Sequence, residues 1–338
     1  MQINGNKSLL VYNTFHIDAS CKYFSEVNSL EEIKELQQSP EYKNNPRLIL
    51  GGGSNLLLTK DYEGLVIKNS IKGRELLRED EKNYYVRAGA GEYWHNFVLW
   101  CIEHNFAGVE NLSLIPGNVG ASPMQNIGAY GAEIREVFHE LEAVHLETGE
   151  KVIFSNSDCH FGYRESVFKN KYKGQFIITS VTYRLNKVPE FNISYGAIEN
   201  ELKSMGVKEL SIKAISDAVI RIRSSKLPDP AVIGNAGSFF KNPEISREKF
   251  EVLKEKFPAI VAYPLENGGV KLAAGWLIEQ CGWKGKRFGD AGVHVNQALV
   301  LVNYGNAKGS EIYELSQQVL DSVKEKFDVL LEREVNII

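Results

Sequence analysis

The sequence has few cysteines, and none of them are close together. Four cysteines, Cys21, Cys101, Cys159 and Cys281, are scattered through 338 residues without a CxxC motif. This usage is typical of a reducing compartment and argues against a structural zinc site. The sequence also lacks an HExxH motif and any clustered set of His, Asp and Glu. We therefore expect no bound metal.

Long hydrophobic runs and a strong net charge are also missing. No segment approaches the ~20 apolar residues that a membrane-spanning helix needs. Met1–Leu10 contains one lysine and no apolar core of a signal peptide. We therefore expect a cytoplasmic protein. The formal net charge of −4 gives no electrostatic basis for binding nucleic acid or an anionic membrane, so an anionic substrate would need a local cationic pocket.

The remaining composition is that of a globular protein with an ordinary core. Hydrophobic residues make up 43% of the chain and charged residues 24%, which is enough to bury a core without disulfides. The length favours two or three domains.

Hydrophobic periodicity predicts short strands alternating with helices in the first half of the chain. Ser29 and Glu32 form a capping-box pattern before a helix whose apolar face includes Ile33 and Leu36. A second helix is predicted over 92–105. Strands are predicted over 48–50, 64–68, 84–88 and 176–185, and a hairpin over 137–154.

A second domain is predicted after about residue 190. Lys226–Pro230 is a clear break in regular structure. Ser310 is expected to cap a long helix with apolar residues at helical spacing up to Phe327. The mixture of elements predicts the α+β class. Further helices are predicted near 198–205, 216–225 and 272–281, and strands over 293–302 and 329–338.

The first glycine-rich loop, Gly51–Asn55, directly follows a predicted strand. Its glycines allow backbone N–H groups to approach a pyrophosphate closely. No Lys-Ser/Thr pair follows, so it is not a P-loop, and Leu56 stands where a Rossmann fingerprint has its third glycine. A tight turn between strands explains the loop equally well. The candidate cofactor residues here are Gly51, Gly52, Gly53, Ser54 and Asn55.

The second glycine-rich region, Ile115–Gly131, is less easily explained as a connector. It contains four glycines, two prolines and three amide side chains. So many special backbone positions beside hydrogen-bonding amides favour a flat, polar ligand. The candidate cofactor residues here are Pro116, Gly117, Gly120, Ala121, Gln125, Ile127, Gly128 and Tyr130.

These loops resemble the FAD-binding segments of the UDP-N-acetylenolpyruvoylglucosamine reductase family. The matching segments include Leu50–Leu56, Pro116–Ala121 and Gln125–Gly131. The matching segments follow one another in the same order as in the family and extend over nearly the whole chain. Within the family, the chain is similar to the subgroup that has a mobile tyrosine loop. The resemblance continues through Gly162–Phe168, Ser225–Pro230, Gly234–Pro243 and Leu331–Val335.

The resemblance implies a vanillyl-alcohol oxidase type of FAD-binding fold with two subdomains and a C-terminal substrate domain. We expect these at 1–70 with a returning strand at 329–338, at 71–190, and at 191–328. FAD would be bound noncovalently, because the first loop has neither His nor Cys. NADPH would reduce it in a monomeric enzyme that makes UDP-N-acetylmuramate. That product serves peptidoglycan synthesis, and with it cell wall biogenesis, cell shape, the cell cycle and cell division.

Three residues are candidates for chemistry on the enolpyruvyl group. By itself, Arg164 could be a surface cation, Ser238 a turn residue and Glu334 an exposed carboxylate. The resemblance implies that Arg164 binds the enolpyruvyl carboxylate, that Glu334 pairs with it, and that Ser238 delivers a proton. Glu332 is an alternative candidate for the role of Glu334. Residues two apart in a strand share one face, so alternation cannot show which of the two glutamates faces the site.

The resemblance also implies a set of substrate contacts. Tyr195 would belong to the mobile loop, although it could equally be a core aromatic. Lys226 and Lys241 would supply the cationic pocket, although most lysines are simply solvated. The implied substrate-binding residues are Tyr195, Lys226, Lys241, Asn242 and Gln297.

Two other functions remain open from the sequence. Another FAD-dependent oxidase or dehydrogenase of the same fold is possible, because fold alone does not determine function. Its reduced flavin would be reoxidised by oxygen and not by the enolpyruvyl sugar. A noncatalytic binder of nucleotide sugars would instead be colourless and would not turn over NADPH.

Overall fold

The structure is a computed structural model that describes residues 1–194 and 196–338. The chain divides into two compact units. Unit 1 comprises Met1–Lys7, Cys21–Gly52 and Tyr62–Ser225, and unit 2 comprises Ser8–Ser20, Gly53–Asp61 and Lys226–Ile338. The division falls inside the first glycine-rich loop, between Gly52 and Gly53.

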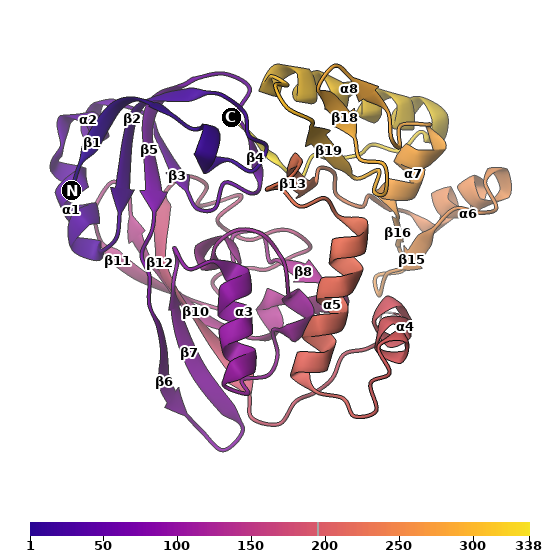
Figure 1. The fold of residues 1–338 in the computed structure, drawn as a ribbon, viewed down its shortest axis with the longest axis horizontal. Helices are drawn as coiled ribbons and strands as arrows, with labels where there is room; N and C mark the ends of the chain where they lie inside the picture. The colour runs from indigo at the N-terminus through magenta and orange to yellow at the C-terminus, as the bar shows by residue number, and fades with distance from the viewer. Residues whose placement is uncertain (195) are drawn as a thin grey trace. The chain divides into compact units, whose positions relative to one another are not determined.

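Unit 1 begins with a four-stranded sheet in the order β1-β2-β5-β3 (Figure 1). Strands β2 and β3 both pair with β5 in parallel. Helix α1 starts after Ser29, whose hydroxyl oxygen accepts the N–H of Glu32 at 3.2 Å, as the capping pattern predicts. The elements are β1 Ile3–Ser8, β2 Ser20–Val27, α1 Leu30–Gln38, α2 Pro40–Asn44, β3 Arg47–Leu50 and β5 Tyr62–Asn69.

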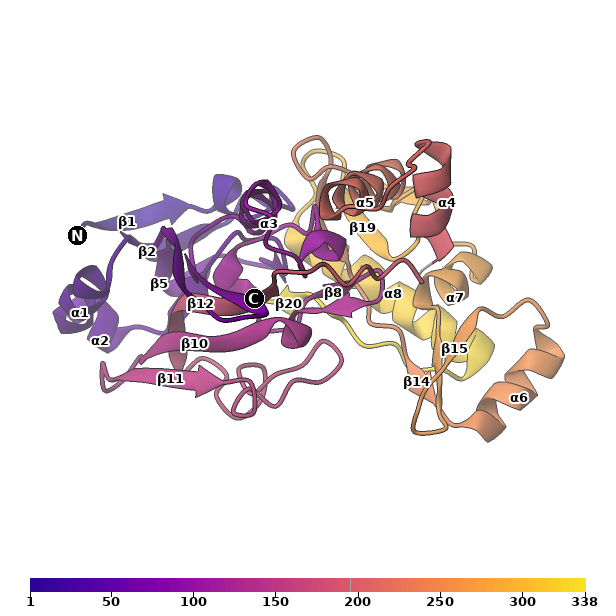
Figure 2. The same cartoon turned by 90° about the horizontal axis from the view of Figure 1, so that it is seen from below.

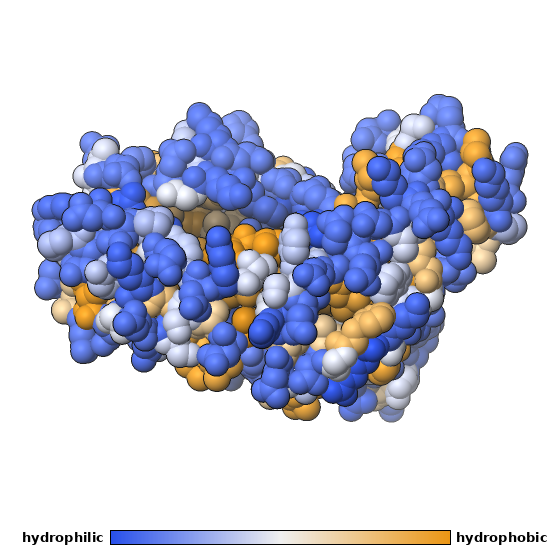
Figure 3. All heavy atoms as spheres, turned by 90° about the horizontal axis from the view of Figure 1, so that it is seen from above, coloured by the Kyte–Doolittle hydropathy of each residue, from blue (hydrophilic) through white to orange (hydrophobic). Residues whose placement is uncertain are grey.

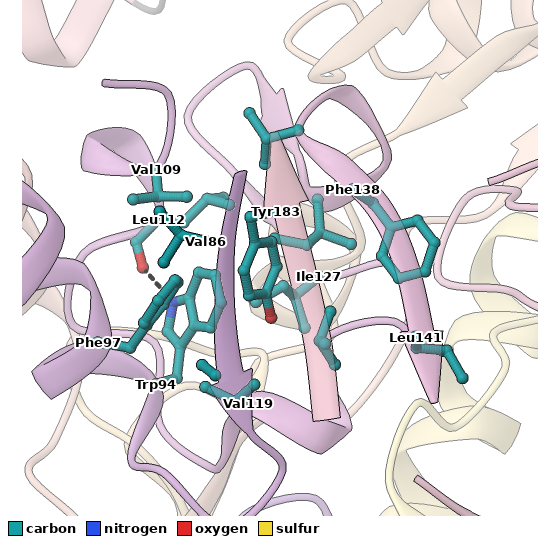
Figure 4. Packing of buried hydrophobic residues seen from close by; sticks show 14 of the residues in the cluster. Val86, Trp94, Phe97, Val109, Leu112, Val119, Ile127, Phe138, Leu141 and Tyr183 are labelled. Carbon is teal, nitrogen blue, oxygen red and sulfur yellow. Dashed lines mark hydrogen bonds between the residues drawn. The ribbon is translucent and has the colours of Figure 1, made fainter. Parts of the chain in front are cut away.

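A five-stranded antiparallel sheet, β11-β10-β12-β7-β6, forms the rest of the unit 1 framework (Figure 1), and Figure 2 shows its strands β11, β10 and β12 from another side. Helix α3 packs Trp94 and Phe97 against Tyr183 of β12 in a fully buried aromatic cluster (Figure 4). The elements are β6 Arg74–Glu79, β7 Asn83–Gly89, α3 Trp94–Glu103, β10 Phe138–His145, β11 Lys151–Ser155 and β12 Phe176–Asn186.

Short elements and two helices complete unit 1. Helices α4 and α5 bury Ile198, Leu202 and Val219 between them, and the Tyr130 side chain packs against this cluster. The elements are η2 Glu110–Leu112, η3 Val119–Ala121, β8 Gly128–Ala129, β9 Ala132–Glu133, η4 Ile134–Glu136, α4 Gly196–Ser204 and α5 Ile212–Lys226.

Unit 2 contains a four-stranded sheet, β13-β19-β18-β17, and a three-stranded sheet, β14-β16-β15. Strand β4, which directly follows the first glycine-rich loop, pairs in parallel with the last strand, β20. The elements are η1 Leu10–Tyr12, β4 Leu56–Leu57, β13 Gly234–Ser238, β14 Glu244–Ile245, α6 Arg247–Lys256, β15 Ala262–Pro264, β16 Val270–Leu272, α7 Ala274–Gln280, β17 Arg287–Phe288, β18 Ala291–Val293, β19 Val300–Asn303, α8 Gly309–Phe327 and β20 Asn336–Ile337.

Three predicted features of unit 2 are wrong in detail. The strand expected over 293–302 is interrupted by a turn, because the His294 N–H donates back to the Val300 carbonyl at 2.9 Å. The strand expected over 329–338 is reduced to β20 and a single bridge between Arg333 and Phe240. Ser310 lies inside α8, which begins at Gly309. The Glu311 carboxylate accepts the Lys308 N–H at 2.6 Å, so the cap lies earlier than predicted.

On the face in Figure 3 hydrophilic side chains dominate, and hydrophobic residues form small, separate groups. Isolated exposed apolar residues such as Val11 and Val188, 81% and 76% exposed, are normal for a folded protein. Among residues 1–194 and 196–338, no helix has the length and apolarity needed to cross a bilayer.

Candidate functional site

The two glycine-rich regions meet inside unit 1. A Cβ atom added at Gly52 would lie 2.8 Å from Asn118 Oδ1 and 2.9 Å from the Gly117 Cα. No real Cβ tolerates such distances to backbone atoms, so the close contact requires glycine. Lys68 also donates from its ammonium group to the Gly51 carbonyl. The turn that follows β3 is therefore packed directly against the Pro116–Ala121 segment.

Asn118 places a buried acceptor beside this contact. Its Nδ2 donates to the Gly91 carbonyl at 3.0 Å. In the part of the chain that the structure describes, its buried Oδ1 has no hydrogen-bond partner. An unsatisfied buried acceptor is costly, so its position in the second glycine-rich region, facing Gly52 of the first, suits a ligand that brings a donor. The residues present therefore fit a polar cofactor.

The second region is held along the approach to helix α3. The Gly120 N–H donates to the Ala90 carbonyl, and the Val119 N–H donates to the Glu92 carbonyl, both at 2.9 Å. The Trp94 N–H donates to the Gly117 carbonyl at 3.0 Å. These bonds satisfy buried backbone groups and fix the path of the loop.

The other half of the first loop belongs to unit 2. Gly53 has φ +65°, and an added Cβ would lie 2.0 Å from the Tyr12 carbonyl oxygen. This position also requires glycine. The Asn55 carbonyl accepts both the backbone N–H and the side-chain amide of Asn336, at 3.1 and 2.8 Å. Ser54 is half-buried.

The Gln125–Gly131 segment forms a small hairpin that contacts Arg164. The Arg164 guanidinium donates to the Gly128 carbonyl at 2.6 Å, and Arg164 itself has φ +56°. Asn126 donates to the Gly162 carbonyl and to the Glu133 carboxylate, both at 2.9 Å. Ile127 is buried. The structure thus brings predicted catalytic and cofactor residues together within unit 1.

A second arginine, Arg223 of α5, interacts electrostatically with Arg164. Burial lowers the pKa of Arg223, and the positive charge of Arg164 lowers it further, whereas the hydrogen bond with Tyr130 opposes this shift. Two guanidinium groups in mutual repulsion provide a local cationic site for an anion. Arg223 could not be predicted from the sequence, because the periodicity of a helix does not distinguish a half-buried arginine from a solvated one.

Ser238 and Glu334 lie on adjacent segments of unit 2. Ser238 ends β13, and the next residue, Phe239, accepts the Glu334 N–H at its carbonyl at 2.8 Å. Within residues 1–194 and 196–338 the Ser238 hydroxyl makes no hydrogen bond. Glu334 is half-buried, whereas Glu332 is exposed and forms an ion pair with Lys241 at 2.8 Å. Their environments therefore differ. The convergence of Arg164 with Ser238 and Glu334 stays a prediction.

The predicted substrate residues are placed individually. Asn242 caps α7 by accepting the Ala274 N–H at 2.9 Å, and Gln297 accepts the Leu299 N–H at 3.2 Å. Lys226 is exposed at the end of α5. Tyr195 lies outside the described residues. The binding roles of this set stay predictions.

Comparisons with known proteins agree with these segments. A family model for an FAD binding domain matches residues 22–155, and the model for the UDP-N-acetylenolpyruvoylglucosamine reductase C-terminal domain matches 229–338. The chain is 55% identical over 339 residues to a UDP-N-acetylenolpyruvoylglucosamine reductase of Flavobacterium johnsoniae, covering 100% of both chains. It is 53% identical over 338 residues to that of Amoebophilus asiaticus, again covering 100% of both.

A solved structure has the same fold over its full length. The UDP-N-acetylenolpyruvylglucosamine reductase of Thermus caldophilus is 24% identical and gives a TM-score of 0.68, covering 100% of this chain and 99% of that one. Together with the FAD-binding model, this likeness confirms the predicted α+β class and FAD-binding fold.

Proposed function

Because this chain belongs to the UDP-N-acetylenolpyruvoylglucosamine reductase family, we propose that its glycine-rich loops and the residues Arg164, Ser238 and Glu334 perform that reduction. The chain is an FAD-dependent oxidoreductase of peptidoglycan precursor synthesis. Its reaction reduces UDP-N-acetylenolpyruvoylglucosamine to UDP-N-acetylmuramate with one hydride from NADPH and one proton, and releases NADP⁺. The observation that supports this function best is the 55% identity across the whole of a curated relative.

FAD binding is assigned to the two packed glycine-rich regions. When bound, FAD supplies the hydride that NADPH provides, because no natural side chain can do so. The close contact of Gly52 with Gly117 leaves backbone N–H groups without covering side chains, which suits a pyrophosphate. The unpartnered Oδ1 of Asn118 offers an acceptor for a cofactor N–H or O–H group. Noncovalent binding follows from the absence of His and Cys in Gly51–Asn55.

Arg164 is assigned to the enolpyruvyl carboxylate. A guanidinium matches a carboxylate bidentately and stays charged. When hydride reaches the terminal carbon, negative charge grows on the adjacent carbon and its carboxylate. A fixed positive group at that place lowers the barrier by about 3–4 kcal/mol in comparable cases. The repulsion between Arg164 and Arg223 is relieved when an anion binds, which supports this assignment.

Ser238 is assigned to proton delivery and Glu334 to the support of the enol form. The Ser238 hydroxyl makes no hydrogen bond within the described chain, so it is available to a substrate carbon. A hydroxyl is a weak acid and needs an activating neighbour or water. Glu334 is half-buried on the adjacent segment, where its N–H donates to the Phe239 carbonyl next to Ser238, and this placement supports its assignment.

The finer organisation forms part of the same proposal. The FAD-holding subdomains are assigned to 1–70, with 329–338, and to 71–190, and the substrate domain to 191–328. The enzyme is assigned to the cytoplasm as a monomer. The remaining substrate contacts are assigned to Tyr195, Lys226, Lys241, Asn242 and Gln297.

The test separates the two half-reactions under anaerobic conditions. We expect purified protein to show a flavin absorption band that NADPH bleaches and that UDP-N-acetylenolpyruvoylglucosamine restores. Restoration by oxygen alone would indicate an oxidase of the same fold. A colourless protein that neither binds added FAD nor consumes NADPH would contradict the proposal.

A further inference from the structure

Leu114 has an unusual backbone conformation just before the second cofactor region. Its φ is +57°, in the left-handed region that residues with a Cβ rarely adopt. Leu114 precedes Ile115 and Pro116, so its conformation sets the direction in which the Pro116–Ala121 segment leaves η2. Such strain persists only where surrounding contacts enforce it.

Two side chains, one from α3 and one from α5, form hydrogen bonds with the backbone N–H and carbonyl of Leu114. The Leu114 N–H donates to His95 Nδ1 at 3.0 Å, and the Leu114 carbonyl accepts from Arg223 Nε at 3.2 Å. His95 belongs to the first turn of α3 and Arg223 to α5. Both polar groups of a strained residue therefore have dedicated partners within unit 1.

The neighbouring contacts keep these partners in place. The Trp94 indole N–H donates to the Leu112 carbonyl at 2.8 Å, which fixes α3 against the same turn (Figure 4). The buried hydroxyls of Ser113 and Ser216 lie 2.8 Å apart and connect the turn to α5. A clamp made from His95 and Arg223 is thus supported on both sides.

The chemistry of the clamp requires a neutral histidine. His95 Nδ1 accepts a backbone N–H, so its proton must be on Nε2. Burial lowers the pKa of His95, and the Arg223 charge lowers it further, which favours this form. Arg223 remains charged at neutral pH because an arginine does not lose its proton under these conditions.

We propose that His95 and Arg223 are positioning residues that hold Leu114 in its left-handed conformation and thereby fix the second glycine-rich region for FAD binding. This inference rests on the proposed use of that region for FAD. Without the clamp, Leu114 relaxes to an ordinary conformation, and fewer molecules have the binding geometry. The apparent dissociation constant of FAD then rises in proportion, since it equals the intrinsic value divided by the competent fraction.

A double-mutant cycle between His95 and Leu114 tests the inference on the full chain. The dissociation constant of FAD is measured by flavin fluorescence with FAD-free protein. His95→Ala is expected to weaken FAD binding about tenfold, because a buried hydrogen bond and the strained conformation are lost together. His95→Gln offers an amide oxygen as acceptor and should restore most of the affinity. In a Leu114→Gly background, His95→Ala should cost less than about threefold, because glycine adopts positive φ without strain.

Controls separate failure of the inference from failure of the function. His104→Ala changes another histidine, at the C-terminal cap of α3, and should leave FAD binding unchanged. A parent protein that binds no FAD would contradict the proposed function. If the parent binds FAD but His95→Ala has the same effect in both backgrounds, or none, the clamp is refuted. If His95→Ala unfolds the parent, folding restored by Leu114→Gly supports the clamp, and unfolding in both backgrounds refutes it.

Discussion

Replacing Gly52 with alanine tests the packing that places the two glycine-rich regions together. The new Cβ would lie 2.8 Å from Asn118 Oδ1, 2.9 Å from the Gly117 Cα and 3.3 Å from the Gly117 carbonyl carbon. The Gly117 backbone cannot move away easily, because its carbonyl accepts the Trp94 N–H at 3.0 Å. Forcing a methyl group into such a contact costs about 1–3 kcal/mol.

Thermal unfolding of FAD-free protein measures this cost without interference from cofactor contacts. At about 2–4 °C per kcal/mol for a domain of roughly 200 residues, a 2 kcal/mol penalty lowers Tm by roughly 4–8 °C. Gly51→Ala is the matched control, because its nearest neighbour would be the Asn118 Cβ at 3.8 Å, an ordinary contact. Equal Tm values for Gly51→Ala and Gly52→Ala would refute the packing argument.

Three further predictions concern the chemistry and the clamp. Ser238→Ala should retain bleaching of the flavin by NADPH but slow its substrate-dependent reoxidation by about 10²-fold or more; equal loss in both half-reactions would mean a structural role. Arg164→Lys should lower kcat at least tenfold, because the bidentate fork is lost; unchanged turnover would remove Arg164 from the mechanism. The pKa of His95 is lowered in the folded protein, so folding favours the neutral imidazole. The stabilisation from neutral His95 is therefore fully present above the ordinary pKa of 6.5 and is lost as the pH falls through the pKa of the folded state. Tm of the FAD-free protein should therefore fall on acidification, and His95→Gln should reduce that part of the slope; an identical slope in the variant would contradict the assignment.

Local sequence patterns predicted the elements whose packing follows from their own residues. The Ser29 cap, the β10–β11 hairpin and strand β12 agree with the expectations from capping, turn residues and β-branched composition. Strand β6 was missed, because all six of its residues are exposed and no hydrophobic alternation marks it. The turn between β18 and β19 was also missed, because the apolar residues of these two buried strands predicted a single strand.

In the candidate site, the contacts between residues far apart in the sequence could not be predicted from local patterns. Glycine content predicted the loops, yet only the fold reveals that Gly52 contacts Asn118 and that Asn118 Oδ1 lacks a partner in the described chain. Alternation could not distinguish Glu332 from Glu334, whereas the ion pair of Glu332 with Lys241 arises from a tertiary pairing. The partners of Leu114 come from two distant helices, so no local pattern could indicate its strain.

The mass of the reaction product shows whether this chain reduces the enolpyruvyl group. The purified chain is incubated anaerobically with UDP-N-acetylenolpyruvoylglucosamine and NADPH, and the sugar nucleotide is analysed by mass spectrometry. We expect the sugar nucleotide to gain one hydride and one proton, with an equal amount of NADPH consumed. If the sugar nucleotide keeps its original mass while NADPH is consumed, the proposed reduction is refuted.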